Sequence, residues 1–200
     1  MLGIAIAGVF PKEPVVPREK ARVLSSKELY KGKVFGVRRD RVIEPGGVEV
    51  TRDIVTHNGS VVVLPVFPDR SILLIRQYRY SAGQFLWELV AGRVEVGEAA
   101  GRAARRELAE ETGFTARRYR KLMDVFPTPG FVTETMVVFL AEGLTAGQAR
   151  PEADEKIEMK RFSLKRLEQM MTNGALRDAK SIAGILYYAR FVRGKRSRNK

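Results

Sequence analysis

Residues 92–114 read GRVEVGEAAGRAARRELAEETGF, and they are the most informative part of the chain. The first residues of this stretch are glycines, valines and charged residues, which is typical of a loop. Residues 99–112 are strong helix formers, and Gly113 follows at the position of a C-terminal cap. The stretch therefore predicts a loop that leads into a helix ending just before Gly113.

Three glutamates share one face of this predicted helix. With 3.6 residues per turn, Glu107, Glu110 and Glu111 fall within an arc of roughly 100°, with Glu107 and Glu111 about 6 Å apart along the axis. Carboxylates this close repel one another and raise one another's pKa unless a positive charge lies nearby. A bound cation would be a hard ion such as Mg²⁺ or Mn²⁺, because the ligands are oxygen atoms. The alternative is a solvated face neutralised by Arg105 or Arg106.

The acidic residues are concentrated in two windows of a basic chain. The 200 residues include 36 Lys and Arg against 23 Asp and Glu, which gives a formal charge of +13. Residues 88–111 and 152–158 together hold ten of these acids, and the rest of the chain has a formal charge of +18. Clustered acids indicate a divalent cation. The basic background indicates anionic ligands, either nucleotides or nucleic acid.

Several classes of protein are disfavoured by composition. The absence of cysteine removes disulfide scaffolds, zinc ribbons, iron–sulfur clusters and thiol nucleophiles. The single histidine, His57, disfavours a zinc site, and we expect it at a turn or strand edge. The longest apolar stretch, residues 2–10, is too short to span a membrane and lacks the flanking residues of a signal peptide. We therefore expect a cytoplasmic protein without a membrane partner.

The remaining sequence alternates predicted strands and helices. Short β-branched runs in residues 1–57, broken by Pro45-Gly46-Gly47, predict an antiparallel meander. Further predicted strands cover 60–67 and 72–78, which form a hairpin, and 85–90, 121–126, 135–141 and 156–162; predicted helices cover 164–171 and 179–192. This order favours an α/β fold with helices packed on a mixed sheet. The predicted units are an N-terminal β subdomain (1–57), a main domain (58–192) and a basic tail (193–200).

The spacing within residues 92–114 resembles the Nudix box, the signature of hydrolases that cleave nucleoside diphosphates linked to another moiety. The matching positions are Gly92, Glu98, Arg106-Glu107-Leu108, Glu110-Glu111 and Gly113. Outside the box, three segments resemble the ADP-ribose pyrophosphatase branch of the family. They are Arg76-Gln77-Tyr78-Arg79, Trp87 to Gly92, and Thr128-Pro129-Gly130 with Glu134. The resemblance implies a Nudix-type α/β/α sandwich with a mixed sheet. It also implies Mg²⁺-dependent hydrolysis of ADP-ribose to AMP and ribose 5-phosphate, with Mn²⁺ as an alternative metal.

The resemblance further assigns roles to individual residues. The implied metal ligands are the carbonyl of Ala91 and the carboxylates of Glu107 and Glu111. The implied catalytic residues are Glu155 as the base, Glu158 as the alternative base, Arg106 and Glu110. The implied substrate-binding residues are Arg76 and Arg79 at the diphosphate, Glu134 at the terminal ribose, and Pro129 and Gly130 in a nearby loop. Gly92, Glu98 and Gly113 have structural roles in the motif, with Glu98 and Arg106 bracing the loop against the helix.

The resemblance leaves the substrate and the partners open. Relatives tend to hold the adenine with N-terminal aromatics, including tryptophan, whereas the only tryptophan here, Trp87, is expected in the core. Tyr30 and Phe35 are the candidate substitutes. The alternatives are hydrolysis of another sugar nucleotide, such as GDP-mannose, and a non-catalytic module that binds ADP-ribose or RNA. We expect a homodimer that acts on a nucleoside diphosphate sugar, and a solvated basic tail rather than a nucleic-acid contact.

Overall fold

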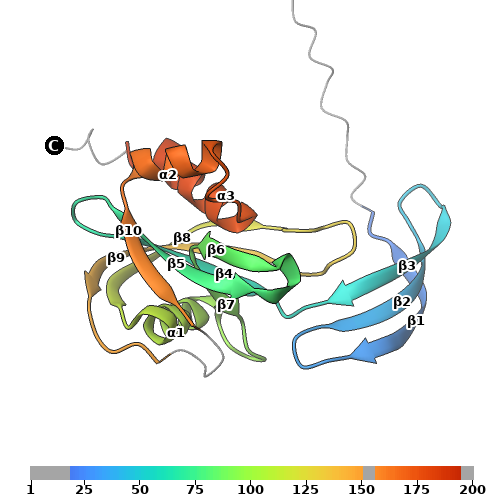
Figure 1. The fold of residues 1–200 in the computed structure, drawn as a ribbon. Helices are drawn as coiled ribbons and strands as arrows, with labels where there is room; N and C mark the ends of the chain where they lie inside the picture. Colours follow the sequence, from blue (N-terminus) through green and yellow to red (C-terminus); the bar gives the residue numbers. More distant parts are fainter. Residues whose placement is uncertain (1–18, 151–155, 195–200) are drawn as a thin grey trace, which may run out of the picture.

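A computed structural model of the chain describes residues 19–150 and 156–194 (Figure 1). Its main sheet contains, in order, β10 (Glu158–Phe162), β5 (Ile72–Arg79), β4 (Ser60–Val66), β9 (Met136–Thr145) and β8 (Thr115–Val125), with β6 (Gln84–Glu88) beside β5 and β7 (Val90–Arg93) beside β4. Strand β9 is parallel to β4, and the other pairings are antiparallel. The predicted mixed sheet is confirmed.

Strand β4 lies at the centre of the sheet because both of its faces are apolar. Val61 and Val63 point to one side, and Val62, Leu64 and Val66 point to the other. These five side chains are almost completely buried. A strand with apolar residues at every position is stable only when both faces of the sheet are covered. The sequence of β4 thus requires a layer of helices on each side.

Helices supply both layers. They are α1 (Ala100–Thr112), α2 (Leu164–Thr172) and α3 (Ala179–Tyr187), followed by the π-helical turn η2 (Tyr188–Val192); a short 3₁₀ turn, η1 (Tyr80–Ala82), follows β5. Ala103, Ala104 and Leu108 of α1 pack with Val61 and Val63, whereas residues of α2 and α3 pack with the opposite face of β4. Figure 1 shows α1 on one side of the sheet and α2 and α3 on the other. The predicted α/β/α sandwich is confirmed.

Helix α1 ends at the predicted residue for two physical reasons. Gly113 has a φ of 71°, a left-handed conformation that favours glycine, and its amide donates to the Ala109 carbonyl at 2.9 Å. A Cβ at this position would also lie only 2.6 Å from the Ala149 amide nitrogen and 2.7 Å from the Gly147 carbonyl oxygen. Gly113 therefore closes the helix and lets the loop after β9 pack against its end.

The strand predicted at residues 85–90 differs from the structure. It is divided into β6 and β7 at Leu89, because the Leu89 amide donates to the Ser181 hydroxyl of α3 at 2.6 Å instead of to a neighbouring strand. Strand β6 pairs with β5 and β7 pairs with β4, so the β4–β5 hairpin pairs only at Val66 and Ile72. Extended structure also continues through Gly92 to Arg93, where the sequence predicted a loop.

The N-terminal strands form a separate three-stranded antiparallel sheet, as predicted. Its strands are β1 (Arg22–Lys31), β2 (Gly36–Ile43) and β3 (Glu49–Thr56). This N-terminal sheet joins the main domain through β3, where the Val55 amide donates to the Phe131 carbonyl at 2.8 Å and the Thr133 amide donates to the Val55 carbonyl at 2.9 Å. In the described part of the chain, no helix has the length and apolar character needed to cross a membrane.

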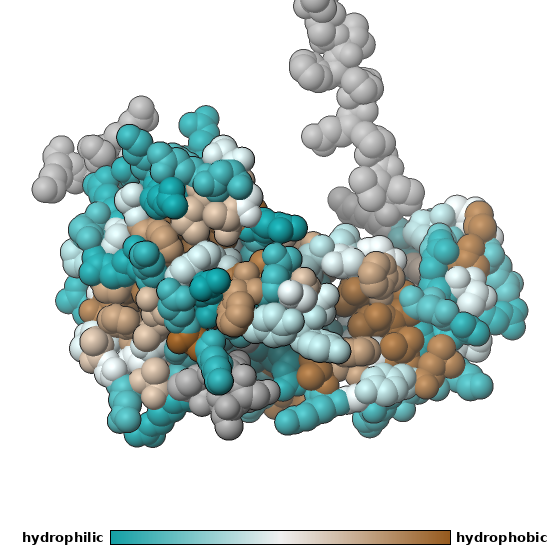
Figure 2. Space-filling view, in the orientation of Figure 1, coloured by the Kyte–Doolittle hydropathy of each residue, from teal (hydrophilic) through white to brown (hydrophobic). Residues whose placement is uncertain are grey.

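Apolar side chains are exposed on the N-terminal sheet. Brown, apolar residues gather over it at the right of Figure 2. The exposed large apolar residues of this region are Val23, Leu24, Leu29, Tyr30, Val34, Phe35 and Val48. Contiguous exposed apolar surface is typical of a protein–protein interface.

Candidate active site

A cavity of about 710 Å³ lies where β4, β7, β9 and α1 meet. Ser60 at the start of β4 and Met136 at the start of β9 form one wall. The opposite wall comes from β7 and α1, and the turn between β1 and β2 contributes Lys33 and Val34. The predicted site residues that line the cavity are Arg79, Ala91, Gly92, Arg106, Glu107, Glu110, Glu111 and Glu134.

Gly92 allows α1 to place a carboxylate against β7. A Cβ built on Gly92 would overlap the carboxylate of Glu107. Only glycine leaves this space, so the Glu107 carboxylate lies directly against the β7 backbone at Gly92. The preceding residue of β7 is Ala91, whose carbonyl is a predicted metal ligand. The first glycine of the motif is therefore tied to the position of one acidic side chain.

Arg106 holds the acidic residues of the motif in place. Its guanidinium donates to both oxygens of Glu98 at 3.1 and 3.0 Å, to Glu107 at 2.8 Å and to Glu110 at 3.0 Å. It also donates to the Arg93 carbonyl at 2.9 Å, which ties α1 to the end of β7. The hydrogen bonds from Arg106 lower the pKa of Glu98, and the carboxylates in turn raise the pKa of Arg106.

The sequence left open the possibility that Arg105 or Arg106 neutralises the glutamates of the predicted helix. In the structure the two arginines have different partners. Arg105 stacks on the ring of Tyr119, with its guanidinium carbon 4.3 Å from the ring centroid. Arg106 alone is bonded to the motif glutamates by the contacts above. Glu111 lines the same cavity and is only 3% exposed.

The cavity offers oxygen donors that suit a hard cation. The Ala91 carbonyl, Glu107 and Glu111 line the same space, and oxygen-only donor sets favour Mg²⁺ and Mn²⁺. Within residues 19–150 and 156–194, no three acidic or histidine side chains converge in a metal-binding arrangement. Glu107 and Glu110 are turned toward Arg106 instead. The oxygen donors of this cavity fit a hard divalent metal.

Arg79 lies at the cavity because a buried carboxylate fixes it there. Glu88 is 1% exposed and accepts two hydrogen bonds from Arg79, at 2.8 and 2.7 Å, and one from Lys180 at 2.6 Å. Lys180 also donates to Asp178 at 2.8 Å, which anchors the start of α3 to the site. Burial raises the pKa of Glu88, but the bonds and charges of Arg79 and Lys180 outweigh burial and hold this pKa below its ordinary value.

Glu134 reaches the cavity through a cluster that the sequence did not reveal. It accepts a hydrogen bond from the Ser60 hydroxyl at 2.7 Å and lies 3.6 Å from Nδ1 of His57. The Gly59 amide donates to the same Nδ1 at 3.0 Å. His57 and Ser60 both line the cavity. The parallel pairing of β4 with β9 brings these residues together, and that long-range pairing leaves no local sequence signal.

Other predicted site residues lie away from the cavity. Arg76 is three positions before Arg79 on β5 and therefore points to the other face of the strand, where it forms a salt bridge with Glu158 at 3.2 Å. Pro129 and Gly130 belong to the loop that joins β8 to β9, beside the residues that bond β3. Glu155, the predicted base, lies outside the described residues.

Comparisons with known proteins agree with this arrangement. The NUDIX domain family profile matches residues 56–184. An ADP-ribose pyrophosphatase of Mycobacterium tuberculosis is 37% identical over 167 residues, which cover 82% of this chain and 80% of that protein. An ADP-ribose pyrophosphatase of Bacillus subtilis is 33% identical over 168 residues, with 83% and 91% covered.

A solved structure has the same fold. The crystal structure of an ADP compounds hydrolase superposes with a TM-score of 0.78 and 21% identity, and covers 88% of this chain and 96% of that one. The family profile and the two relatives together show that this chain belongs to the Nudix family. Nudix hydrolases generally use a divalent metal ion, which agrees with the oxygen donors around Gly92.

Proposed function

We propose that this Nudix pyrophosphohydrolase cleaves the diphosphate bond of ADP-ribose and releases AMP and ribose 5-phosphate. The observation that carries the proposal is the carboxylate site built on Gly92, in a chain whose relatives over most of its length are ADP-ribose pyrophosphatases. Every acidic position of the motif is filled. A module that only bound ADP-ribose or RNA would not need to retain all of them.

The metal ligands in this proposal are the Ala91 carbonyl, Glu107 and Glu111, with Mg²⁺ as the metal and Mn²⁺ as the alternative. A bound Mg²⁺ neutralises charge on the diphosphate oxygens and lowers the pKa of bound water. Arg106 keeps Glu107 and Glu110 at the cavity wall through its hydrogen bonds. Glu155 takes the proton from the attacking water, and Glu158 is the alternative base.

The substrate-binding residues follow from the walls of the cavity. Arg79 donates to the diphosphate, because Glu88 fixes its guanidinium in position before substrate arrives. Glu134 accepts from hydroxyls of the terminal ribose. Tyr30 and Phe35, whose ring centroids lie 5.7 Å apart, flank the Lys33–Val34 turn and provide the aromatic surface for the adenine. Arg93 holds this turn at the site through the Lys33 carbonyl, at 3.0 Å.

We also propose a homodimer formed through the exposed apolar residues of the N-terminal sheet. Pairing two copies there would remove this apolar surface from water. Analytical ultracentrifugation tests the dimer, and a single monomeric species at micromolar concentration would contradict it. We keep the proposed division into an N-terminal β subdomain (1–57), a main domain (58–192) and a basic tail (193–200). We also propose a cytoplasmic location.

The decisive experiment replaces one buried metal ligand. Glu111→Gln should reduce Mg²⁺-dependent release of AMP from ADP-ribose roughly 1,000-fold, because several kcal/mol of transition-state stabilisation are lost at about 1.4 kcal/mol per tenfold. Its thermal unfolding should change little, since glutamine has the shape and volume of glutamate. The matched control is Glu168→Gln on the exposed side of α2, which should keep full turnover.

A substrate panel tests the specificity. ADP-ribose, GDP-mannose and NADH are assayed side by side with Mg²⁺ and with Mn²⁺. The proposal expects the largest kcat/KM for ADP-ribose. A larger value for GDP-mannose would replace the substrate while leaving the reaction class intact, and full turnover by the Glu111→Gln variant would overturn the metal assignment.

A further inference from the structure

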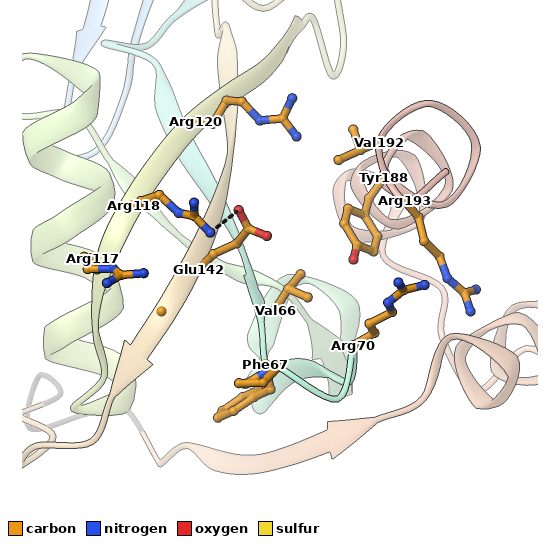
Figure 3. Close-up of a pocket in the computed structure, with 12 residues that line it drawn as sticks. Val66, Phe67, Arg70, Arg117, Arg118, Arg120, Glu142, Tyr188, Val192 and Arg193 are labelled. Atoms are coloured by element: carbon orange, nitrogen blue, oxygen red, sulfur yellow. Dashed lines mark ion pairs between the residues drawn. The ribbon is translucent and has the colours of Figure 1, made fainter. Parts of the chain in front are cut away.

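A second cavity lies at the opposite end of the same strands. It has a volume of about 680 Å³ and is bordered by Val66 at the end of β4 and by Glu142 and Gly143 on β9 (Figure 3). Ser60, at the other end of β4, lines the active-site cavity. Strands rise about 3.3 Å per residue, which places roughly 20 Å between Ser60 and Val66. Among the described residues, none lines both cavities.

The walls of this arginine cavity are strongly basic. It is lined by five arginines and a single acid, Glu142; the arginines are Arg70, Arg117, Arg118, Arg120 and Arg193. Arg118 lies 3.7 Å from Glu142. Within the parts of the chain that the structure describes, the other four arginines have no salt bridge. Uncompensated positive charge in a concave site attracts an anion strongly, because the walls limit screening by water.

The arginines come from three separate segments, and the strand geometry of β8 explains two of them. Tyr119 points to α1, where Arg105 stacks on its ring. Since neighbouring residues of a strand point to opposite faces, Arg118 and Arg120 point to the side on which η2 packs. In Figure 3 the Arg120 side chain extends toward Val192 of η2.

Arg117 and Arg70 border the cavity in other ways. Arg117, which points to the same face of β8 as Tyr119, borders it beside Gly143. A Cβ on Gly143 would lie 3.1 Å from Cβ and 3.6 Å from Nε of Arg117, so the bare glycine leaves room for that side chain across β9. Arg70 has a φ of 66° and is the only described non-glycine residue in the left-handed region. It occupies the turn position that usually carries glycine, after Pro68 and Asp69. An arginine is retained at a position where its backbone conformation is unfavourable.

One side of the arginine cavity is apolar and held rigidly. Phe67 packs edge-on against Phe114, with the ring centroids 5.5 Å apart, and Arg161 stacks on its face at 3.9 Å. Val66 and Tyr188 are buried beside it. A ligand would therefore meet a fixed apolar wall and guanidinium groups from several sides of the cavity. Arginine matches phosphate oxygens geometrically through its paired N–H groups.

We propose that the arginine cavity is a binding site for a small oligophosphate, meaning a phosphorylated molecule that carries at least two linked phosphate groups. Five arginines exceed what one phosphate needs, and a chain of phosphates can bond several of them at once. The volume lies in the range of small-molecule sites. The concave shape and the volume of this site suit a compact anion, and binding of an RNA strand is one outcome of the test. The proposal does not depend on the substrate of the active site.

The test measures binding of inorganic tripolyphosphate to the full chain. Isothermal titration calorimetry is done at 0.15 M ionic strength without added divalent metal, and we expect one saturable site per chain. Arg120→Gln combined with Arg193→Gln should weaken binding about tenfold or more, because two charge-assisted hydrogen bonds are lost. Both residues are exposed, and unchanged thermal unfolding of the variant verifies that it is folded.

Two further variants distinguish a built site from general attraction. Lys165→Gln combined with Arg166→Gln removes the same charge from the exposed side of α2 and should change the affinity less than twofold. Arg70→Gly should weaken binding without lowering stability. Equal weakening by the α2 variant, no saturable binding, or tighter binding of a twelve-nucleotide RNA than of tripolyphosphate through the same arginines would each overturn the proposal.

Discussion

The two cavities of this molecule lie at opposite ends of β4 and β9, and they use arginine in different ways. In the active-site cavity, Arg79 is bonded to the buried carboxylate of Glu88. Arg106 there is bonded to three glutamates of the motif. In the arginine cavity, five arginines and one glutamate line the walls, and among these described arginines Arg118 lies within salt-bridge distance of Glu142.

The difference shows that pairing, rather than the number of charges, separates the two sites. An arginine bonded to a buried carboxylate is fixed before the ligand arrives, so it can orient a substrate without a further loss of side-chain entropy. Arginines that lack a nearby carboxylate repel one another, and an anionic ligand relieves that repulsion. The first arrangement suits catalysis and the second suits binding.

The largest expected effect concerns the active-site cavity. Gly92→Ala places a methyl group where the Glu107 carboxylate lies, and the carboxylate is the end of a flexible side chain that can move away. We expect ADP-ribose turnover to fall about 100-fold, since misplacing a catalytic group by about 1 Å has an effect of this size. Thermal stability should change little. Steady-state kinetics and differential scanning calorimetry measure the two quantities.

Gly101→Ala is the matched control for this substitution. Gly101 lies in the first turn of α1, and no atom lies within 4 Å of a Cβ built there. The control should retain full turnover. A Gly92→Ala variant with full turnover would mean that the contact between Gly92 and Glu107 does not matter for the reaction.

The next prediction tests whether the buried carboxylate of Glu88 fixes Arg79, unlike the arginines of the second cavity. Glu88→Gln leaves Arg79 and Lys180 without their shared carboxylate, and we expect a loss of about 2 kcal/mol in the free energy of unfolding at pH 7. The pKa of Glu88 is lowered in the folded state from an ordinary value of 4.5. Its contribution is therefore complete above that pH and is lost as the pH falls through the lowered value.

Urea unfolding at several pH values measures this difference. The gap between the wild-type chain and Glu88→Gln should be constant from pH 7 to about pH 5 and should narrow below about pH 4.5. Glu158→Gln on β10 is the control, because it removes the exposed partner of Arg76, which lies on the same strand as Arg79, and it should leave the unfolding midpoint unchanged. A gap that widened at low pH would contradict the assigned direction of the Glu88 pKa.

The parts of the fold and the site that have local signals could be predicted from the sequence. Residues 92–114 predicted α1 and its end at Gly113, because helix formers and a capping glycine are adjacent in the chain. The same stretch placed Glu107 and Glu111 on one face, and both line the cavity. Nearly continuous apolar runs at residues 60–67 and 72–78 likewise predicted the central strands.

Features that depend on long-range pairing could not be predicted. Arg76 and Arg79 look alike in the sequence, but the alternation of β5 and the position of Glu88 bring only Arg79 to the cavity. The contact of Glu134 with Ser60 needs the parallel pairing of β4 and β9. The arginine cavity combines segments more than a hundred residues apart, so the sequence revealed its charge only as a basic background.

The smallest expected effect concerns Arg70, and it separates stability from binding in the second cavity. The left-handed conformation costs a non-glycine residue roughly 1–2 kcal/mol, and glycine gives back about 0.5–1 kcal/mol through the greater freedom of the unfolded chain. Arg70→Gly should therefore raise the free energy of unfolding by about 0.5 kcal/mol, measured by urea denaturation. A residue kept only for the fold would not be arginine here, because glycine fits the turn better. A loss of stability in this variant would show that the Arg70 side chain supports the turn itself. Arg70 would then not belong with the arginines of the second cavity that lack a carboxylate partner among the described residues and bind the ligand.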